Sequence, residues 1–136
     1  MSVARIDPIG PERLVAIDGE VPEGALEGLA ALRLGPRELL VLDAEASALP
    51  SLPGALVVDV GDAHEGWSIH GPGAAHLLAR ACTLDLDSVR PGDATRTAMA
   101  GIPVILRRVA PGGWELRVER SHAAWLEAWL RSLGAG

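Results

Sequence analysis

Apolar and polar residues alternate along several short segments of the chain, the pattern of β-strands that bury one face. The clearest example is residues 114–119, where Trp114, Leu116 and Val118 alternate with charged residues. Similar apolar runs predict further strands at residues 31–34, 38–42, 55–60, 67–70, 95–99 and 102–109. Because residues 55–60 are apolar on both faces, they predict a central strand.

Two other segments have the periodicity of helices. Residues 74–81 follow the turn Gly71-Pro72-Gly73, whose proline suits the start of a helix. Near the carboxyl end, Ser121 is placed to cap a second helix and Gly134 to end it. The apolar positions of this second helix form a single stripe, which consists of Leu126, Trp129, Leu130 and Leu133.

The order of these elements predicts the fold class. Strands joined by short turns, with one helix between them and one after them, favour an α+β fold. In such a fold helices cover one face of an antiparallel sheet, and we expect a ferredoxin-like arrangement. Residues 1–30 have no clear period and are interrupted by prolines and glycines. We therefore expect an amino-terminal arm at residues 1–30 and a single α+β domain at residues 31–136.

Composition and charge exclude several classes of function. The 136-residue chain has a net charge of −6 and a pI near 5.1, so its average field repels nucleic acids and anionic membrane surfaces. Cys82 is the only cysteine, which excludes an intrachain disulfide and predicts a cytoplasmic protein. Residues 1–10 contain Asp7 and Pro8 where a signal peptide would need an apolar segment. Lysine and tyrosine are absent, which removes two common catalytic groups.

The Gly71-Pro72-Gly73 turn is the candidate for a phosphate site, because backbone N–H groups at the start of a helix can bind anions. A dinucleotide fingerprint of the form G-x-G-x-x-G is not completed, since His76 stands where the third glycine belongs. A turn that starts a helix explains these residues without a ligand. We therefore assign no cofactor-binding residue to this chain.

The histidines and the cysteine are the candidates for a metal site or a nucleophile. Zinc ligands are usually close pairs such as Cys-x-x-Cys, and no such pair occurs among His64, His70, His76, His122 and Cys82. Cys82 has only His76 or His70 as a nearby base, and the end of the predicted helix disfavours a thiolate there. A small buried thiol explains Cys82 better, so no catalytic and no metal-binding residue is assigned.

An acidic loop follows the first predicted helix and contains Asp85, Asp87 and Asp93. A calcium-binding EF-hand loop would need ligands and a glycine turn at defined positions, but Val89 and Arg90 occupy this part of the loop. The loop is therefore interpreted as a solvated surface segment.

Trp125 is the candidate for a partner interface. Trp125 and Trp129 are four residues apart on the last predicted helix. The apolar stripe accounts for Trp129 by packing against the sheet, whereas Trp125 lies beside the stripe. Because the anchors of protein interfaces are often Trp or Arg, Trp125 is the residue that we expect at a contact with another subunit.

Several motifs of the chain, taken in their order and spacing, together carry a resemblance to one known family. The similarity extends from about residue 31 to residue 133. It includes Leu-Arg-Leu-Gly-Pro at 32–36, the Gly-Pro-Gly helix start, Ala-Cys-Thr-Leu-Asp-Leu at 81–86, Ala-Gly-Ile-Pro-Val at 100–104 and Glu-Arg-Ser-His-Ala-Ala-Trp-Leu-Glu-Ala-Trp-Leu at 119–130. With these motifs the chain resembles the gamma subunit family of heterotetrameric sarcosine oxidase. This family is a small relative of the folate-binding domain of the aminomethyltransferases, so the resemblance implies that fold.

The resemblance also implies a function. The chain would be a non-catalytic structural subunit of sarcosine oxidase or of a related N-methyl amino acid oxidoreductase complex. Its partners would be larger flavin-binding subunits that hold FAD, FMN, NAD and zinc, with no cofactor in this chain. The sequence has no Tyr or Phe to enclose a pterin ring, so tight folate binding is not expected. Two alternatives stay open: a free-standing tetrahydrofolate-binding one-carbon protein, and a small self-assembling scaffold that forms homo-oligomers.

Overall fold

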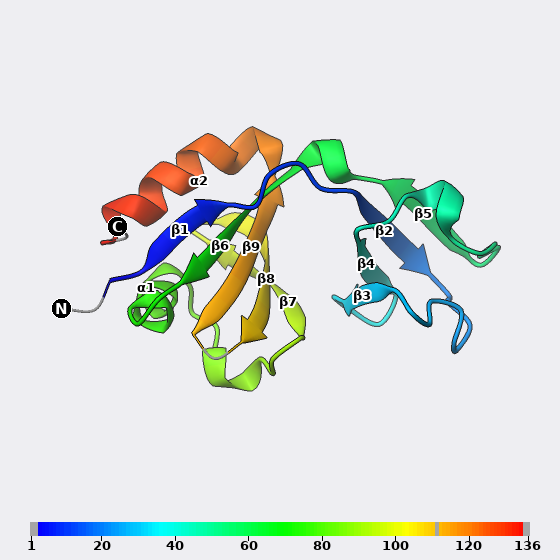
Figure 1. Cartoon of the computed structure of the whole chain (residues 1–136), viewed down its shortest axis with the longest axis horizontal. Coiled ribbons are helices and arrows are strands. Elements are labelled where there is room, and N and C mark those ends of the chain that lie inside the picture. Colours follow the sequence, from blue (N-terminus) through cyan, green and yellow to red (C-terminus); the bar gives the residue numbers. More distant parts are fainter. Residues whose placement is uncertain (1–2, 111, 135–136) are drawn as a thin grey trace. The chain divides into compact units, whose positions relative to one another are not determined.

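The computed structural model describes residues 3–110 and 112–134, which form two compact units (Figure 1). The helical unit contains the described residues of the ranges 1–10 and 64–136. The β unit contains residues 11–63. Each unit has its own antiparallel sheet and its own cluster of buried apolar side chains.

This division corrects the predicted arm at residues 1–30 and the predicted single domain at residues 31–136. The amino-terminal segment is not an arm, because it contributes one strand to each sheet. The boundaries between the units lie at residues 10–11 and 63–64. The β unit is thus inserted between the first strand and the rest of the helical unit.

The helical unit is built on a five-stranded antiparallel sheet with the order β1-β6-β9-β8-β7. Pairing of β6 with β9 places Trp67 opposite Leu116 and Ile69 opposite Trp114. Side chains alternate between the two faces along a strand, so these residues share one apolar face. The five strands are β1 (Arg5–Pro8), β6 (His64–His70), β7 (Ala94–Met99), β8 (Ile102–Ala110) and β9 (Gly113–Glu119).

Two helices, α1 (Ala74–Ala81) and α2 (Arg120–Ser132), pack against the apolar face of this sheet. A short 3-10 turn, η3 (Leu86–Ser88), follows α1. The predicted α+β class is therefore confirmed. The element order of the unit is β-β-α-β-β-β-α, which differs from the β-α-β-β-α-β order of a ferredoxin-like motif. The helical residues buried in the core are Ala74, Leu77, Leu78, Ala81, Ala123, Leu126 and Leu130.

The β unit is built on a four-stranded antiparallel sheet with the order β3-β4-β2-β5. One face is covered by the unit's own loops, and its core contains Val15, Ile17, Leu39, Val41, Ala44 and Leu52. Its strands are β2 (Leu14–Gly19), β3 (Ala30–Arg33), β4 (Glu38–Leu42) and β5 (Ala55–Asp59). Two 3-10 turns, η1 (Ala46–Ala48) and η2 (Gly61–Ala63), precede and follow β5.

The prediction that residues 55–60 form a central strand is wrong, because β5 lies at the edge of its sheet and pairs with β2. Ala55 and Val57 pack against the core of the β unit. Leu56 and Val58 point to the other face and are 66% and 42% exposed. A strand with apolar residues on both faces is usually covered on both sides, and here one side of β5 is open.

The ends of the helices follow the predictions in part. Helix α2 begins at Arg120 with Glu119 as its N-cap, so Ser121 lies inside the first turn and is not the cap. Gly134 follows α2 with a φ of +115°, a conformation that glycine adopts without strain, and the predicted end is confirmed. The helices have eight and thirteen residues. In the described part of the chain, none is long and apolar enough to cross a membrane.

Candidate functional site

Helix α2 exposes a tryptophan on the surface of the helical unit. Trp125 is 55% exposed, whereas Ala123, Leu126 and Leu130 of the same helix are buried against the sheet. Trp129 is half-buried and packs against this core. The Trp125 ring stacks on the Trp129 ring, with a centroid distance of 6.2 Å and an angle of 11° between the planes. The core thus holds Trp129, and Trp129 in turn supports the exposed ring of Trp125.

At the positions three and four residues from Trp125, helix α2 has no acidic residue and no arginine. Its neighbours three and four positions away are Ser121, His122, Ala128 and Trp129. The charged pair of the helix lies elsewhere: Arg131 Nη2 donates to Glu127 Oε2 at 3.0 Å and to the Ile6 carbonyl oxygen of β1 at 2.9 Å. An exposed aromatic ring with no acidic or arginine side chain three or four positions away on its helix is typical of a site that another protein covers.

A second feature lies on the sheet face opposite the helices, where Glu115 joins two arginines. Arg107 Nη1 and Arg117 Nη1 donate to the same Glu115 Oε1 at 3.1 and 2.9 Å. Sequence alternation places Arg117 on the charged face of its strand, and in the structure this residue is only 2% exposed. Burial raises the pKa of Glu115, but attraction to Arg117 and hydrogen bonds from both arginines outweigh it, so the net pKa is lowered.

The lowered pKa of Glu115 predicts a loss of stability in acid. A carboxylate with a depressed folded-state pKa stabilises the protein above its unfolded pKa of about 4.3, and this stabilisation is lost as the pH falls through the folded-state pKa. We expect Glu115→Gln to lower the free energy of unfolding by about 2 kcal/mol at neutral pH. Urea unfolding across a pH series measures this free energy. The difference in free energy of unfolding between variant and wild type should disappear below about pH 4. If this difference did not depend on pH, the ion pairs of Glu115 would not be its cause.

The Gly71-Pro72-Gly73 turn uses its backbone N–H groups within the protein. Gly73 N–H donates to the Val3 carbonyl oxygen at 3.2 Å, and Ala74 N–H donates to the Gly71 carbonyl oxygen at 3.1 Å. Gly71 has a φ of +96°, and a Cβ atom there would lie 2.8 Å from the Val3 oxygen. The turn therefore holds the chain just before β1 and starts α1, and the Gly73 and Ala74 N–H groups bind backbone oxygens of the protein.

Cys82, the candidate nucleophile, makes a structural contact at the end of helix α1. Cys82 is 8% exposed, and its Sγ donates to the Leu78 carbonyl oxygen at 3.3 Å, which closes the end of α1. His76 is exposed on the same helix. His70 Nε2 lies 2.5 Å from Asp7 Oδ2 in the neighbouring strand β1. Cys82 is thus the buried structural thiol that its position predicted.

The acidic loop also has a structural explanation. Asp85 accepts a hydrogen bond from the backbone of Asp87 at 3.2 Å, and its carbonyl oxygen accepts one from Ser88 Oγ at 2.6 Å. These contacts form the turn η3. Within residues 3–110 and 112–134, no three His, Cys, Asp or Glu side chains approach one another closely enough to hold a metal ion.

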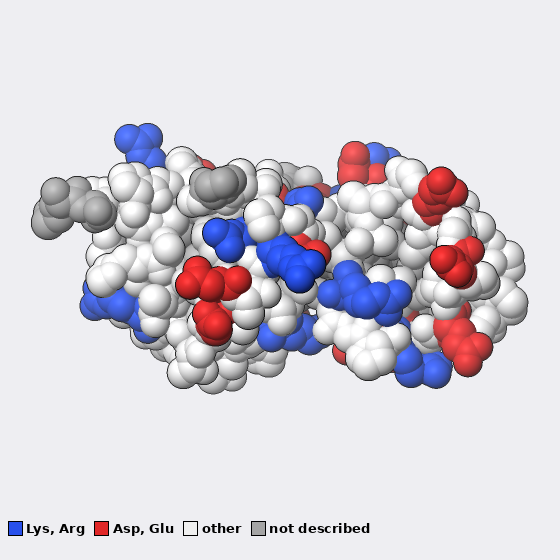
Figure 2. Space-filling model, turned by 90° about the horizontal axis from the view of Figure 1, so that it is seen from below, with Lys and Arg blue, Asp and Glu red and all other residues white. Residues whose placement is uncertain are grey.

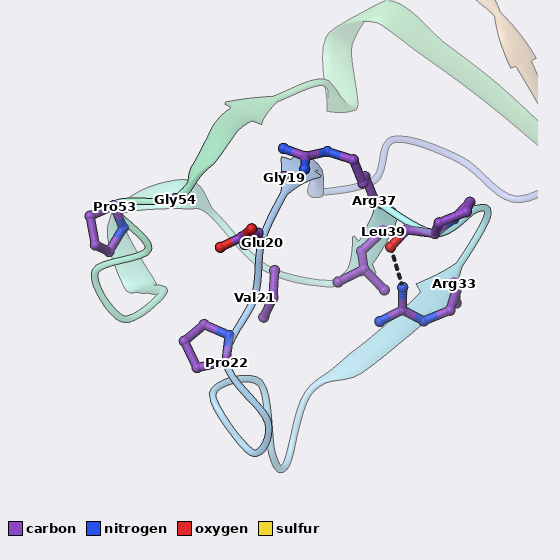
Figure 3. A pocket seen from close by; sticks show the side chains of 10 residues that line it. Gly19, Glu20, Val21, Pro22, Arg33, Arg37, Leu39, Pro53 and Gly54 are labelled. Carbon is purple, nitrogen blue, oxygen red and sulfur yellow. Dashed lines mark hydrogen bonds between the residues drawn. The ribbon is translucent and has the colours of Figure 1, made fainter.

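The β unit contains a pocket of about 560 Å³ that the sequence did not indicate (Figure 3). Arg33, Arg37 and Glu20 line it together with prolines, glycines and two aliphatic residues. Arg33 Nη1 donates to the carbonyl oxygens of Gly35 and Pro36, both at 3.2 Å, so its guanidinium is held by the turn. No aromatic side chain lines this pocket, and its residues do not fit a stacked pterin ring.

Comparisons of sequence place the chain among known proteins, although no family model matches it. The gamma subunit of sarcosine oxidase from Corynebacterium sp. strain U-96 is 35% identical over 126 residues, which cover 86% of this chain and 61% of the relative. The gamma subunit from Arthrobacter sp. is 37% identical over 106 residues, which cover 71% of this chain and 51% of the relative. The chain thus spans between half and two thirds of the length of these relatives.

Comparisons of structure agree on the fold. A chain of heterotetrameric sarcosine oxidase from Corynebacterium sp. U-96 matches with a TM-score of 0.81 and 22% identity, over 96% of this chain and 83% of that chain. Aminomethyltransferase T of the glycine cleavage system from Bartonella henselae matches with a TM-score of 0.63 and 17% identity, over 94% of this chain and 45% of that chain. The fold is therefore of the aminomethyltransferase-like class. Over the residues that align, the chain is thus related to the gamma subunits of sarcosine oxidase, with 32–37% identity to three of them.

Proposed function

We propose that the chain is a non-catalytic structural subunit of a heterotetrameric sarcosine oxidase, or of a related complex that oxidises N-methyl amino acids. The observation that carries this proposal is the identity of 32–37% to three curated gamma subunits of sarcosine oxidase. The fold match to a chain of a heterotetrameric sarcosine oxidase agrees with it. The relatives are longer than this chain, so the activity and substrate of the complex are part of the proposal.

In this proposal, other subunits carry the cofactors. We expect FAD, FMN, NAD and zinc on larger flavin-binding subunits and no cofactor on this chain. The hydrogen-bonded Gly71-Pro72-Gly73 turn and the buried thiol of Cys82 support a structural role for the residues that first suggested chemistry. We also propose a cytoplasmic location, in line with a sequence that has a single cysteine.

We propose that Trp125 marks a contact with a partner subunit. Its ring is exposed, it is stacked on Trp129, and no helix neighbour three or four positions away is acidic or an arginine. A partner with an apolar, uncharged surface suits this part of α2, because a buried charge without a partner would oppose association. Trp129 keeps the Trp125 ring in place before binding, which reduces the entropy that assembly costs.

Co-expression with the other subunits of the source organism's complex tests the proposed function. We expect this chain to co-purify with them in stoichiometric amounts. The chain purified alone should be colourless and inactive with sarcosine and an electron acceptor, because it lacks a dinucleotide fingerprint and an assembled acid–base group. Flavin absorbance or turnover by the isolated chain would contradict the non-catalytic role.

Two further measurements separate this proposal from the alternatives. Calorimetric titration with tetrahydrofolate should show weak binding or none, and a dissociation constant of about 1 μM would favour a folate-binding protein instead. Sedimentation of the isolated chain measures self-association. A stable homo-oligomer that does not bind the other subunits would favour a scaffold.

A further inference from the structure

The two units of the chain differ strongly in charge. The β unit has ten Asp and Glu residues and three arginines, a net charge of −7. The ranges 1–10 and 64–136 have eight acidic residues and nine arginines, a net charge of +1. Figure 2 shows acidic side chains in red on the visible face of the β unit, in the right-hand part of the view. The negative charge of the chain therefore belongs to the β unit.

The edge strand β5 presents apolar side chains within this acidic unit. Leu56 and Val58 lie two residues apart, point to the same face, and are 66% and 42% exposed. Among the described residues, β5 pairs with β2 on one side and with no strand on the other. Natural proteins usually protect such an edge with charged residues, proline or a covering segment. Strand β5 contains no proline, and its single charged residue, Asp59, lies at its end and accepts a hydrogen bond from the Ala46 N–H at 2.7 Å.

An acidic row borders the exposed apolar residues on the same face of the sheet. Asp18 of β2 lies directly opposite Leu56, and it also lies opposite Glu38 of β4. Directly opposed residues on neighbouring strands point to the same face. The face therefore has an apolar part, Leu56 and Val58, next to a row with two carboxylates.

We propose that Leu56, Val58 and Asp18, here called the β5 surface, form a second docking surface for a partner subunit of the complex. The partner surface has an apolar strip that covers Leu56 and Val58 and an arginine or lysine that approaches Asp18. Charge complementarity supports this occupant, since a unit with a net charge of −7 is attracted to a basic surface and repelled by a second copy of itself. The inference rests on the proposed subunit role and adds the chemistry of the partner.

The apolar part of the β5 surface is tested with the double substitution Leu56→Thr and Val58→Thr. Threonine keeps the strand propensity of these positions, so the melting temperature should change little. We expect the dissociation constant for the remaining subunits, purified without this chain, to rise by about tenfold or more. The matched control is Val109→Thr, the same change at a residue of the helical unit that is 44% exposed. This control should assemble like the wild type.

The acidic part is tested by the kinetics of assembly. Raising the salt concentration from about 0.05 M to about 0.5 M should slow association by about tenfold, because screening shortens the range of attraction between opposite charges. Asp18→Asn should also speed dissociation, since it removes a charge at the contact itself. Glu27→Gln is the control, because it removes one charge from the β unit outside its sheet and should leave dissociation unchanged.

The outcomes distinguish this inference from the proposed function. If the wild-type chain does not bind the other subunits, both fail. If it binds and Trp125→Ala weakens binding, but the threonine double variant binds like the wild type, the β5 surface is not a contact. If the association rate of the wild type did not depend on salt, the proposal of a basic partner surface would be contradicted. Self-association of the isolated chain that the double variant abolishes would assign the β5 surface to a second copy and overturn the inference.

Discussion

Replacing Trp125 with alanine is expected to weaken binding to the partner subunit by about 30-fold, or about 2 kcal/mol, and to change the stability of the chain by less than about 0.5 kcal/mol. More than half of this side chain is exposed, so its removal leaves no cavity in the core. At a partner interface the same ring would be desolvated and packed on both sides. The two quantities are measured by co-purification or interferometry with the other subunits and by thermal melting.

Trp125→Phe is the informative control for this prediction, because it keeps an aromatic ring that can stack on Trp129. Its affinity should lie between those of the wild type and Trp125→Ala. A lowered melting temperature for Trp125→Ala together with unchanged assembly would show that Trp125 supports the helix and that the proposed contact on α2 is wrong.

Elements defined by neighbouring residues could be predicted from the sequence. The alternation of Trp114, Leu116 and Val118 identifies β9, and the apolar stripe of α2 identifies the helix that covers it. The same stripe separates Trp129, which packs against the core, from Trp125, which is exposed. In these cases a short period in the sequence determines which side chains are buried.

Features that depend on distant pairing could not be predicted in this way. Strand β1 is four residues long and buries only Ile6, and its partner β6 lies more than fifty residues later in the chain. The position of β5 at a sheet edge is likewise set by its neighbour β2 and not by its own apolar residues. The predictions of an arm and of a central strand are wrong for the same reason, because pairing between strands distant in the sequence determines both features.

The charged group around Glu115 shows a second limit of prediction from the sequence. Alternation correctly places Glu115 and Arg117 on the face opposite Trp114, but it cannot tell whether that face is open to solvent. Arg117 is buried there and shares a carboxylate oxygen with Arg107. A buried arginine is recognised only when its acidic partner on a neighbouring position or strand is known.

The largest loss of stability is expected for Trp114→Ala, about 3–5 kcal/mol. Trp114 is 3% exposed, lies opposite Ile69 in the sheet, and has the Arg108 guanidinium 5.4 Å from its ring centroid. Truncation would remove both the packing and this cation–π contact. Trp129→Ala should cost less, about 1–2 kcal/mol, because Trp129 is only half-buried.

Tryptophan fluorescence can measure these losses in the helical unit alone, because all four tryptophans of the chain lie in that unit. This matters because two compact units need not unfold in a single step. In urea, each variant should shift the fluorescence midpoint at a constant slope, with the order Trp114→Ala, then Trp129→Ala, then Trp125→Ala. If Trp129→Ala destabilised the unit more than Trp114→Ala, the main support of the sheet would come from α2 rather than from the β9 side chains, and the described core would be wrong.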